Sequence, residues 1–176
     1  MLALYVPRLV YKKRFPKTNS SREPYVLLAV LLWTTSLVAY IAGLEWLGPH
    51  LYVLEWLRWG GVAAMFGCIP LSVWTYRTLG AHFSTRLGLL DEHTLVDTGP
   101  YALVRHPMYA TLFLCAAGAS VTSAQPSVLA ASIFLVVIMT LRIKKEEAML
   151  AERFGESYLA YMKKTGALVP KLPLLD

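Results

Sequence analysis

Uncharged apolar stretches alternate with short polar segments along the chain. Residues 25–44, 59–76 and 107–141 contain no Asp, Glu, Lys or Arg. The hydrocarbon core of a bilayer needs about 20 residues of helix, so each of the first two stretches predicts one span. The third is too long for one span, and the small, polar sequence SVTSAQP at its middle indicates a tight turn. The pattern predicts four transmembrane helices, over about 25–44, 57–76, 106–122 and 126–142.

These elements indicate an all-α, polytopic integral membrane protein, folded as a single domain over residues 1–176. Buried helices of a soluble bundle are the alternative, but such helices are typically amphipathic. Small residues allow close helix approach where they gather within a span. They do so in the second span at Gly60, Gly61 and Gly67, and in the third around Gly118.

The polar segment after the fourth span has a pattern of its own. An apolar residue recurs every four positions at Leu150, Phe154, Tyr158 and Met162. This spacing predicts an amphipathic helix, which we expect Gly155 to bend. The helix can lie on the bilayer surface or fold back over the long polar loop between the second and third spans.

Composition and charge support a membrane protein and fix its orientation. Only 16% of the 176 residues are charged, whereas soluble domains carry about 25%. Lys and Arg concentrate in the N-terminal segment, the central loop and the segment after the fourth span. The positive-inside rule therefore places both termini and the central loop in the cytoplasm. The net charge of +6 reflects this bias, and no basic face interleaved with aromatics indicates a nucleic-acid partner.

Cysteine and histidine spacing predicts no metal site. Cys68 and Cys115 both lie in predicted spans, and the chain has no CxxC pattern. His82, His93 and His106 lack the i,i+3 or i,i+4 spacing of a helical ligand set.

Charged and polar residues gather where the third and fourth spans meet the cytoplasm. Arg142 and Glu146 are four apart and share a helical face, whereas Glu147 points about 100° away. A surface ion pair is one interpretation, yet charges near hydrocarbon tend to be kept for function. His106 precedes Pro107, which disfavours helical geometry at His106 and starts the third span. The unbonded N–H groups of that first turn can face a ligand.

The sequences EHTLVDTGPYALVRHPMYA and RIKKEEAMLAERFGESYLAYMKKTG, taken together, resemble the isoprenylcysteine carboxyl methyltransferase family and its wider phospholipid-methyltransferase relatives. The resemblance implies a cytoplasmic S-adenosylmethionine site within a catalytic region of about 82–166 and a methyl acceptor in the membrane. It implies a catalytic, substrate-binding role for Arg142. A further contact, held by Gln in eukaryotic members, falls on Arg86. The implied cofactor contacts are His93, Thr94, Leu95, Val96, Tyr101, His106, Pro107, Met108, Tyr109 and Glu146.

The chemistry of these side chains favours a carboxylate as the methyl acceptor. A carboxylate is ionised at neutral pH and needs no general base, and Arg142 can hold it by a bidentate contact. The substrate expected is therefore a lipid-like, isoprenylcysteine-type carboxylate. An amine would have to lose a proton, and the sequence offers no obvious dedicated base, although Glu147 and His82 are conceivable.

Three alternatives stay open. Phospholipid amine N-methyltransferases share much of the C-terminal pattern, and Arg142 would accept their phosphate while repelling the ammonium. Sterol reductases end in a similar RHP-x-Y region and use NADPH, although this chain lacks an obvious basic pocket for the 2′-phosphate. A non-catalytic membrane scaffold is the third alternative.

Overall fold

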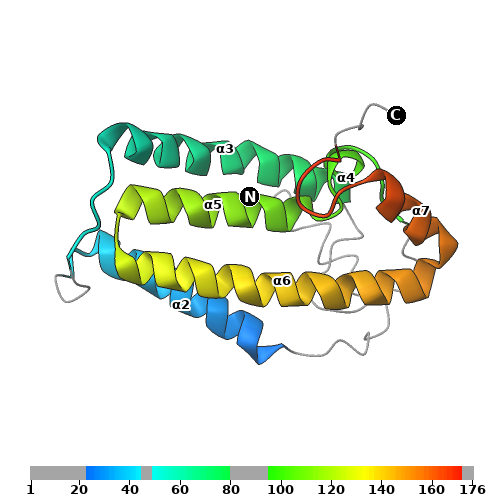
Figure 1. The fold of residues 1–176 in the computed structure, drawn as a ribbon, viewed down its shortest axis with the longest axis horizontal. Helices are drawn as coiled ribbons and strands as arrows, with labels where there is room; N and C mark the ends of the chain where they lie inside the picture. Colours follow the sequence, from blue (N-terminus) through cyan, green and yellow to red (C-terminus); the bar gives the residue numbers. More distant parts are fainter. Residues whose placement is uncertain (1–22, 45–48, 80–94, 172–176) are drawn as a thin grey trace, which may run out of the picture.

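The computed structural model describes residues 23–44, 49–79 and 95–171, and within these ranges the protein is all-α (Figure 1). The only β pairing in the described part is one isolated bridge between Val104 and Gly166. The all-α prediction is therefore confirmed for these residues. The helices are α2 (Pro24–Ile41), α3 (Glu55–Leu79), α4 (Pro100–Leu103), α5 (Pro107–Ser123), α6 (Pro126–Phe154) and α7 (Glu156–Lys164).

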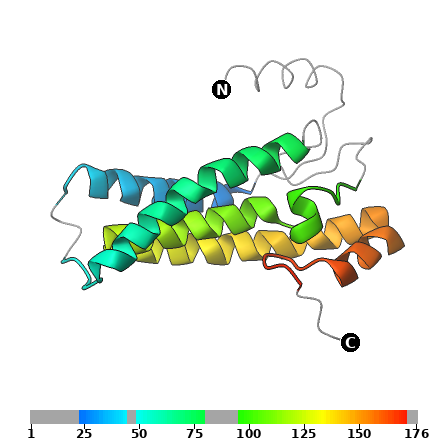
Figure 2. The same cartoon turned by 90° about the horizontal axis from the view of Figure 1, so that it is seen from above.

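Four long helices lie side by side, and the two short ones lie at one end of them (Figures 1 and 2). α3 packs along α5, α5 packs on α6, and α2 packs on the other side of α6. Fully buried Ala29, Ala116 and Leu135 form the centre of the core, one from each of α2, α5 and α6. Both α5 and α2 are thus held against α6.

The turns lie where the sequence predicted them. Ala124, with φ of 52°, links α5 to α6 within the SVTSAQP segment, and Pro126 begins α6. His106 has an extended φ of −125° and precedes Pro107 at the first position of α5. Gly155, with φ of 53°, separates α6 from α7, a conformation that a residue with a Cβ adopts only with strain. The predicted bend at Gly155 is confirmed.

α3 and α5 approach so closely that glycine is required at their crossing. A Cβ on Gly61 would lie 2.8 Å from the Gly118 carbonyl oxygen, and a Cβ on Gly118 would lie 2.8 Å from that of Gly61. Gly60, one residue earlier, has open space around it. The prediction of close packing by small residues is confirmed at Gly61 and Gly118.

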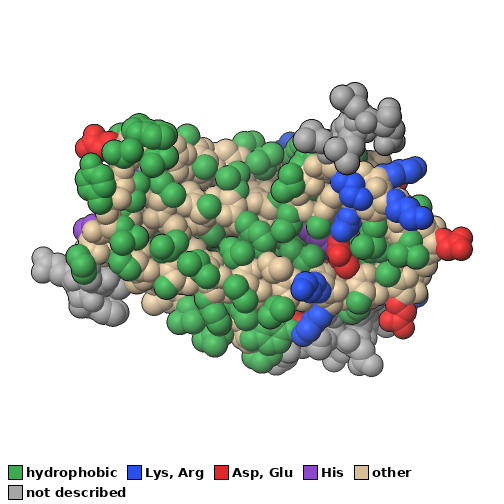
Figure 3. All heavy atoms as spheres, viewed as in Figure 1, with side chains coloured by type: hydrophobic (Ala, Val, Ile, Leu, Met, Phe, Trp, Pro, Cys, Tyr) green, Lys and Arg blue, Asp and Glu red, His purple; other side chains and the backbone are tan. Residues whose placement is uncertain are grey.

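Large apolar side chains cover much of the outside of the bundle. In Figure 3 they extend along the long helices, while charged side chains gather at the end that holds α7. By length and composition, α2 and α6 could each cross a membrane. α5 is shorter, with 17 residues, and the four-span count stays a prediction. Exposed examples are Leu27, Leu31, Val38, Phe66, Ile69 and Val137.

α6 extends past the predicted end of the last span. That span was expected to end at about residue 142, and the helix continues without a break to Phe154, over 29 residues. The charges after Leu141 do not end the helix, because Arg, Lys and Glu are good helix formers. The same helix therefore carries both an apolar segment and the charged segment that follows it.

Candidate functional site

The candidate site lies at the charged end of the bundle (Figure 3), where Figure 1 shows α4, the start of α5, the second half of α6 and α7. The tight turn at Ala124 reverses the chain, so α5 begins beside the second half of α6. The polar residues that precede α5 therefore lie beside the charges of α6.

Glu146 is at the centre of the first group of side chains. Its Oε2 accepts a hydrogen bond of 2.9 Å from the Tyr109 hydroxyl. The charge of Glu146 also acts on Tyr101 and His106. Burial is the main reason that the pKa of Tyr101 lies well above its usual value, and the Glu146 charge raises this pKa further. Burial and the nearby carboxylate thus both favour the neutral form of the Tyr101 hydroxyl.

Glu147 organises a second group, which we call the Glu147 clamp: Arg105, His106 and Glu147. The Glu147 Oε1 atom accepts hydrogen bonds from Arg105 Nε at 2.9 Å and Nη2 at 2.7 Å. His106 Nε2 lies 3.2 Å from the same oxygen. The Arg105 and Glu147 side chains are only 9% and 19% exposed, so solvent screens this pair little. From the sequence, Glu147 was considered only as a conceivable base, and this structural role was not predicted.

α7 bonds to α4, and the segment after α7 bonds to the residues that precede α5. The backbone N–H groups of Arg105 and His106 donate to the carbonyls of Gly166 and Ala167 at 2.8 and 3.0 Å. Arg105 Nη1 donates to the Thr165 carbonyl as well. The Tyr161 hydroxyl donates to the Tyr101 carbonyl at 2.5 Å, and burial raises the pKa of Tyr161 to about 12. These hydrogen bonds join the C-terminal helix to the described end of the central loop, and its placement relative to the bilayer stays a prediction.

Arg142 lies on α6 at the side that faces the start of α2. Its Nη1 atom is 3.6 Å from Oε2 of Glu23, the residue before α2, and its side chain is 12% exposed. Its charge also acts on Tyr109, which connects it to the Glu146 group. The interpretation of Arg142 as part of a surface ion pair does not fit this burial. Sequence reasoning missed Glu23 because no local pattern links it to a residue so far along the chain.

The other predicted site residues are distributed as follows. Leu95 and Val96 are partly buried in the segment that leads to α4. Pro107 is buried and Met108 is partly buried, both in the first turn of α5. His82, Arg86, His93 and Thr94 lie outside the described residues. Among the residues that the structure does describe, no three His, Cys, Asp or Glu side chains are grouped as metal ligands.

Fold and site together define a helical protein with an apolar outer surface and a buried polar site at one end of its bundle. Comparison with known proteins then identifies the family. The sequence model of the isoprenylcysteine carboxyl methyltransferase family matches residues 62–152, which include α5 and most of α6. The chain belongs to this family.

Three curated relatives illustrate the extent of the similarity. A protein-S-isoprenylcysteine O-methyltransferase of Schizosaccharomyces pombe is 40% identical over 83 residues, 47% of this chain and 35% of the relative. The Homo sapiens protein of the same name is 32% identical over 158 residues, 86% of this chain and 52% of the relative. An uncharacterised Bacillus subtilis protein, YpbQ, is 29% identical and matches over 76% of this chain and 77% of its own length.

A solved structure has the same arrangement of helices. It is described as a eukaryotic intramembrane Ras methyltransferase, and it superposes with a TM-score of 0.59 at 25% identity. The match covers 85% of this chain and 53% of that chain. This chain therefore spans about half, or less, of the length of the named methyltransferases that it matches.

Proposed function

We propose that the protein is an S-adenosylmethionine-dependent methyltransferase that transfers a methyl group to the carboxylate of an isoprenylcysteine-type substrate. The observation that supports this most is the placement of a mostly buried Arg142 beside the Tyr109–Glu146 pair. A buried guanidinium favours an anionic partner, and its planar donors match a carboxylate. Family membership and the names of the relatives point to the same reaction.

The side chains around Glu146 fit the cofactor chemically. When bound, S-adenosylmethionine supplies an activated methyl group. The Glu146 carboxylate suits an ammonium or ribose hydroxyls, and the aromatic faces of Tyr101 and Tyr109 suit a sulfonium or an adenine. The first turn of α5, entered through His106 and Pro107, presents backbone N–H groups that suit a carboxylate. We propose that His93, Thr94, Leu95, Val96 and Met108 complete the contacts.

The role of these residues in catalysis is to position the reactants. An ionised carboxylate is already a nucleophile, so the site needs no general base. Arg142 holds the acceptor carboxylate, and the Glu146 group holds the methyl donor beside it. The Glu147 clamp joins α6 to Arg105, which in turn bonds to the carbonyls of Thr165 and Gly166, so it holds the segment after α7 beside the residues that precede α5.

We also propose that α2, α3, α5 and the apolar part of α6 are four transmembrane spans, with the site and both termini in the cytoplasm. The exposed apolar side chains along the bundle support this placement. Most described Lys and Arg residues lie at the α7 end, and Arg58 lies near the other end, as expected for a cytoplasmic α7 end. The substrate then reaches Arg142 from within the bilayer.

Calorimetric titration of the detergent-purified protein tests the cofactor assignment. We expect S-adenosylmethionine and S-adenosylhomocysteine to bind and NADPH not to bind. Glu146→Ala should weaken this binding at least about tenfold, because a hydrogen bond to a charged group contributes about 1.5–3 kcal/mol. Glu152→Ala, a change at an exposed carboxylate on the same helix, is the matched control.

Methyl transfer from labelled cofactor to N-acetyl-S-farnesylcysteine tests the reaction. Arg142→Ala should retain cofactor affinity and lose transfer, and Arg142→Lys should lose most of it because lysine cannot make a bidentate contact. Undiminished turnover in Arg142→Ala would refute its role. Transfer to phosphatidylethanolamine vesicles instead of the prenylated acid would replace carboxyl methylation with amine methylation.

A further inference from the structure

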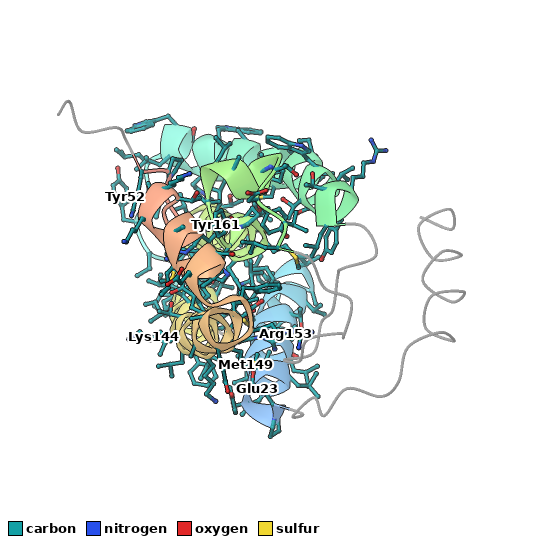
Figure 4. All side chains as sticks on the ribbon, turned by 90° about the vertical axis from the view of Figure 1, so that its right-hand side faces the viewer. Glu23, Tyr52, Lys144, Met149, Arg153 and Tyr161 are labelled. Carbon is teal, nitrogen blue, oxygen red and sulfur yellow. The ribbon has the colours of Figure 1, made fainter. Side chains whose placement is uncertain are left out.

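Glu23 connects the start of α2 to the charged segment of α6. Its side chain is only 6% exposed. One carboxylate oxygen, Oε2, faces Arg142 Nη1 at 3.6 Å, and the other, Oε1, faces Lys145 Nζ at 3.3 Å. The Tyr25 hydroxyl also donates to Oε1. In Figure 4, Glu23 lies beside α6 on the side away from Tyr161 of α7.

The two halves of this carboxylate are held differently. At 3.6 Å, the Arg142 contact is an ion pair that is longer than a normal hydrogen bond of about 2.7–3.2 Å. Oε2 is buried and has no hydrogen-bond partner among the described residues. Attraction between charges therefore dominates the contact with Arg142, and directional bonding does not fix it. A second carboxylate that offers Arg142 good hydrogen-bond geometry can compete for it.

The Oε1 atom of Glu23 would keep its contacts with Lys145 and Tyr25 if Arg142 moved away from Oε2. Lys145 Nζ lies 2.6 Å from the Tyr25 hydroxyl and 4.9 Å from the centre of its ring. Hydrogen bonds to Tyr25 and Glu23 raise the pKa of Lys145, so its ammonium stays charged. Glu23 would thus remain paired with a cation after it releases Arg142. A buried carboxylate with no counter-ion, which would be costly, never arises.

We propose that Glu23 is a positioning residue that occupies Arg142 in the ligand-free protein, yields it to the substrate carboxylate, and takes it back after methylation. This inference rests on the proposed function, since it needs Arg142 to bind the acceptor.

Charge balance explains why the exchange runs in this order. In the reaction, a carboxylate oxygen forms the new bond to the methyl carbon as the bond between sulfur and that carbon breaks. The electron pair of the broken bond stays on sulfur, and no proton moves. The acceptor loses its negative charge and becomes a neutral ester. Arg142 then has one nearby anion fewer, and Glu23, still anchored by Lys145, pairs with it again and favours release of the ester.

The test compares the full chain with its Glu23→Gln, Glu23→Asp and Glu152→Gln variants. The acceptor is N-acetyl-S-farnesylcysteine, and its methyl ester is the product inhibitor. We expect Glu23→Gln to lower the KM for the acid by about two- to fivefold, the upper part of the range for one partly screened charge pair. The inhibition constant of the ester should fall as well, because no carboxylate competes for Arg142, while kcat does not rise.

The two control variants separate the exchange from a structural role. Glu23→Asp keeps the carboxylate and should stay near the original constants, whereas Glu152→Gln removes an exposed charge and should change neither. Circular dichroism and gel filtration check that each variant is folded. A raised KM, or unchanged KM and ester inhibition, in folded Glu23→Gln would overturn the proposal. If the unaltered protein methylates no prenylated acid, the proposed function fails and this inference fails with it. If turnover occurs but the constants of Glu23→Gln do not change, only the exchange is refuted.

Discussion

On α6, the side chains of Glu146 and Glu147 leave the helix about 100° apart. Glu146 accepts from Tyr109 on α5, and Glu147 accepts from Arg105, which precedes α5 and also bonds to the carbonyls beyond α7. Two adjacent carboxylates therefore have separate tasks. Glu146 belongs to the proposed cofactor site. Glu147 connects α6 to Arg105 and, through Arg105, to the segment that follows α7.

This division predicts different effects for two similar substitutions. Glu147→Gln removes the charge that a mostly buried Arg105 needs, and we expect a loss of about 2–3 kcal/mol in stability. Thermal unfolding in detergent should show a lower midpoint, and limited proteolysis should cut faster near α7. Glu152→Gln, at an exposed site on α6, should show neither change. An unaltered midpoint and cutting rate in Glu147→Gln would refute the clamp.

For single residues, the sequence indicates which side chains belong to the candidate site better than it indicates which side chains they contact. Glu146 and Tyr109 were both predicted as site residues, and the structure brings them into contact. The partners of Arg142 and Lys145 were not predicted, because Lys145 and Glu23 are 122 positions apart. Contacts of that separation depend on how α2 packs on α6, which no local spacing records.

At the scale of elements, the crossing of α3 and α5 sets the width of the bundle. Gly61 and Gly118 face each other there, and each lacks room for a Cβ. Arg58 Nε donates to the Thr122 carbonyl at 3.0 Å, close to the same crossing. Both contacts require the helices to stay at their present separation.

Gly61→Ala should destabilise the protein by about 1–3 kcal/mol, because the added carbon would meet the backbone of α5. Gly60→Ala is the matched control. It faces open space and should be neutral or slightly stabilising, since alanine is the better helix former. Unfolding followed by the helical circular dichroism signal compares the two variants. Equal midpoints would show that the crossing tolerates a wider spacing.

The four long helices were predictable because apolar stretches, prolines and glycines all indicate the same boundaries. Pro126 begins α6, and Gly155 separates α6 from α7, as expected. Helix beyond Leu141 was expected, since Arg142 and Glu146 were placed on one helical face, but a single unbroken helix from Pro126 to Phe154 was not. The sequence shows where apolar residues end, but a helix of good formers does not have to end there. Likewise, amphipathicity alone does not predict the hydrogen bond from Tyr161 of α7 to Tyr101 of α4.

For the whole molecule, apolar and charged surfaces divide along the long axis of the bundle (Figure 3). Tyr52 is exposed near the start of α3, and Lys163 is exposed on α7, at the charged end. If the bundle spans a bilayer, these two positions lie on opposite sides of it.

Cysteine labelling in membranes tests this placement. We expect Lys163→Cys to react with a membrane-impermeant maleimide only in inside-out vesicles, and Tyr52→Cys only in intact cells, as the charge asymmetry predicts. Detergent-solubilised protein, in which both positions should react, is the control for accessibility. Labelling of both positions from one side would refute the arrangement of spans.

The uninterrupted course of α6 sets a fixed distance between its apolar segment and the candidate site. Exposed Val137 and the site residue Glu146 lie on one helix, with no hinge between them in the 29 residues from Pro126 to Phe154. At about 1.5 Å per residue, their axial separation is about 14 Å, set by the geometry of the backbone. Under the proposed function, the depth at which α6 rests among the acyl chains would therefore also set how far from them the methyl group is transferred. A substrate whose reactive group lies at a different distance from its hydrocarbon chain would have to change its conformation to bring that group to the site.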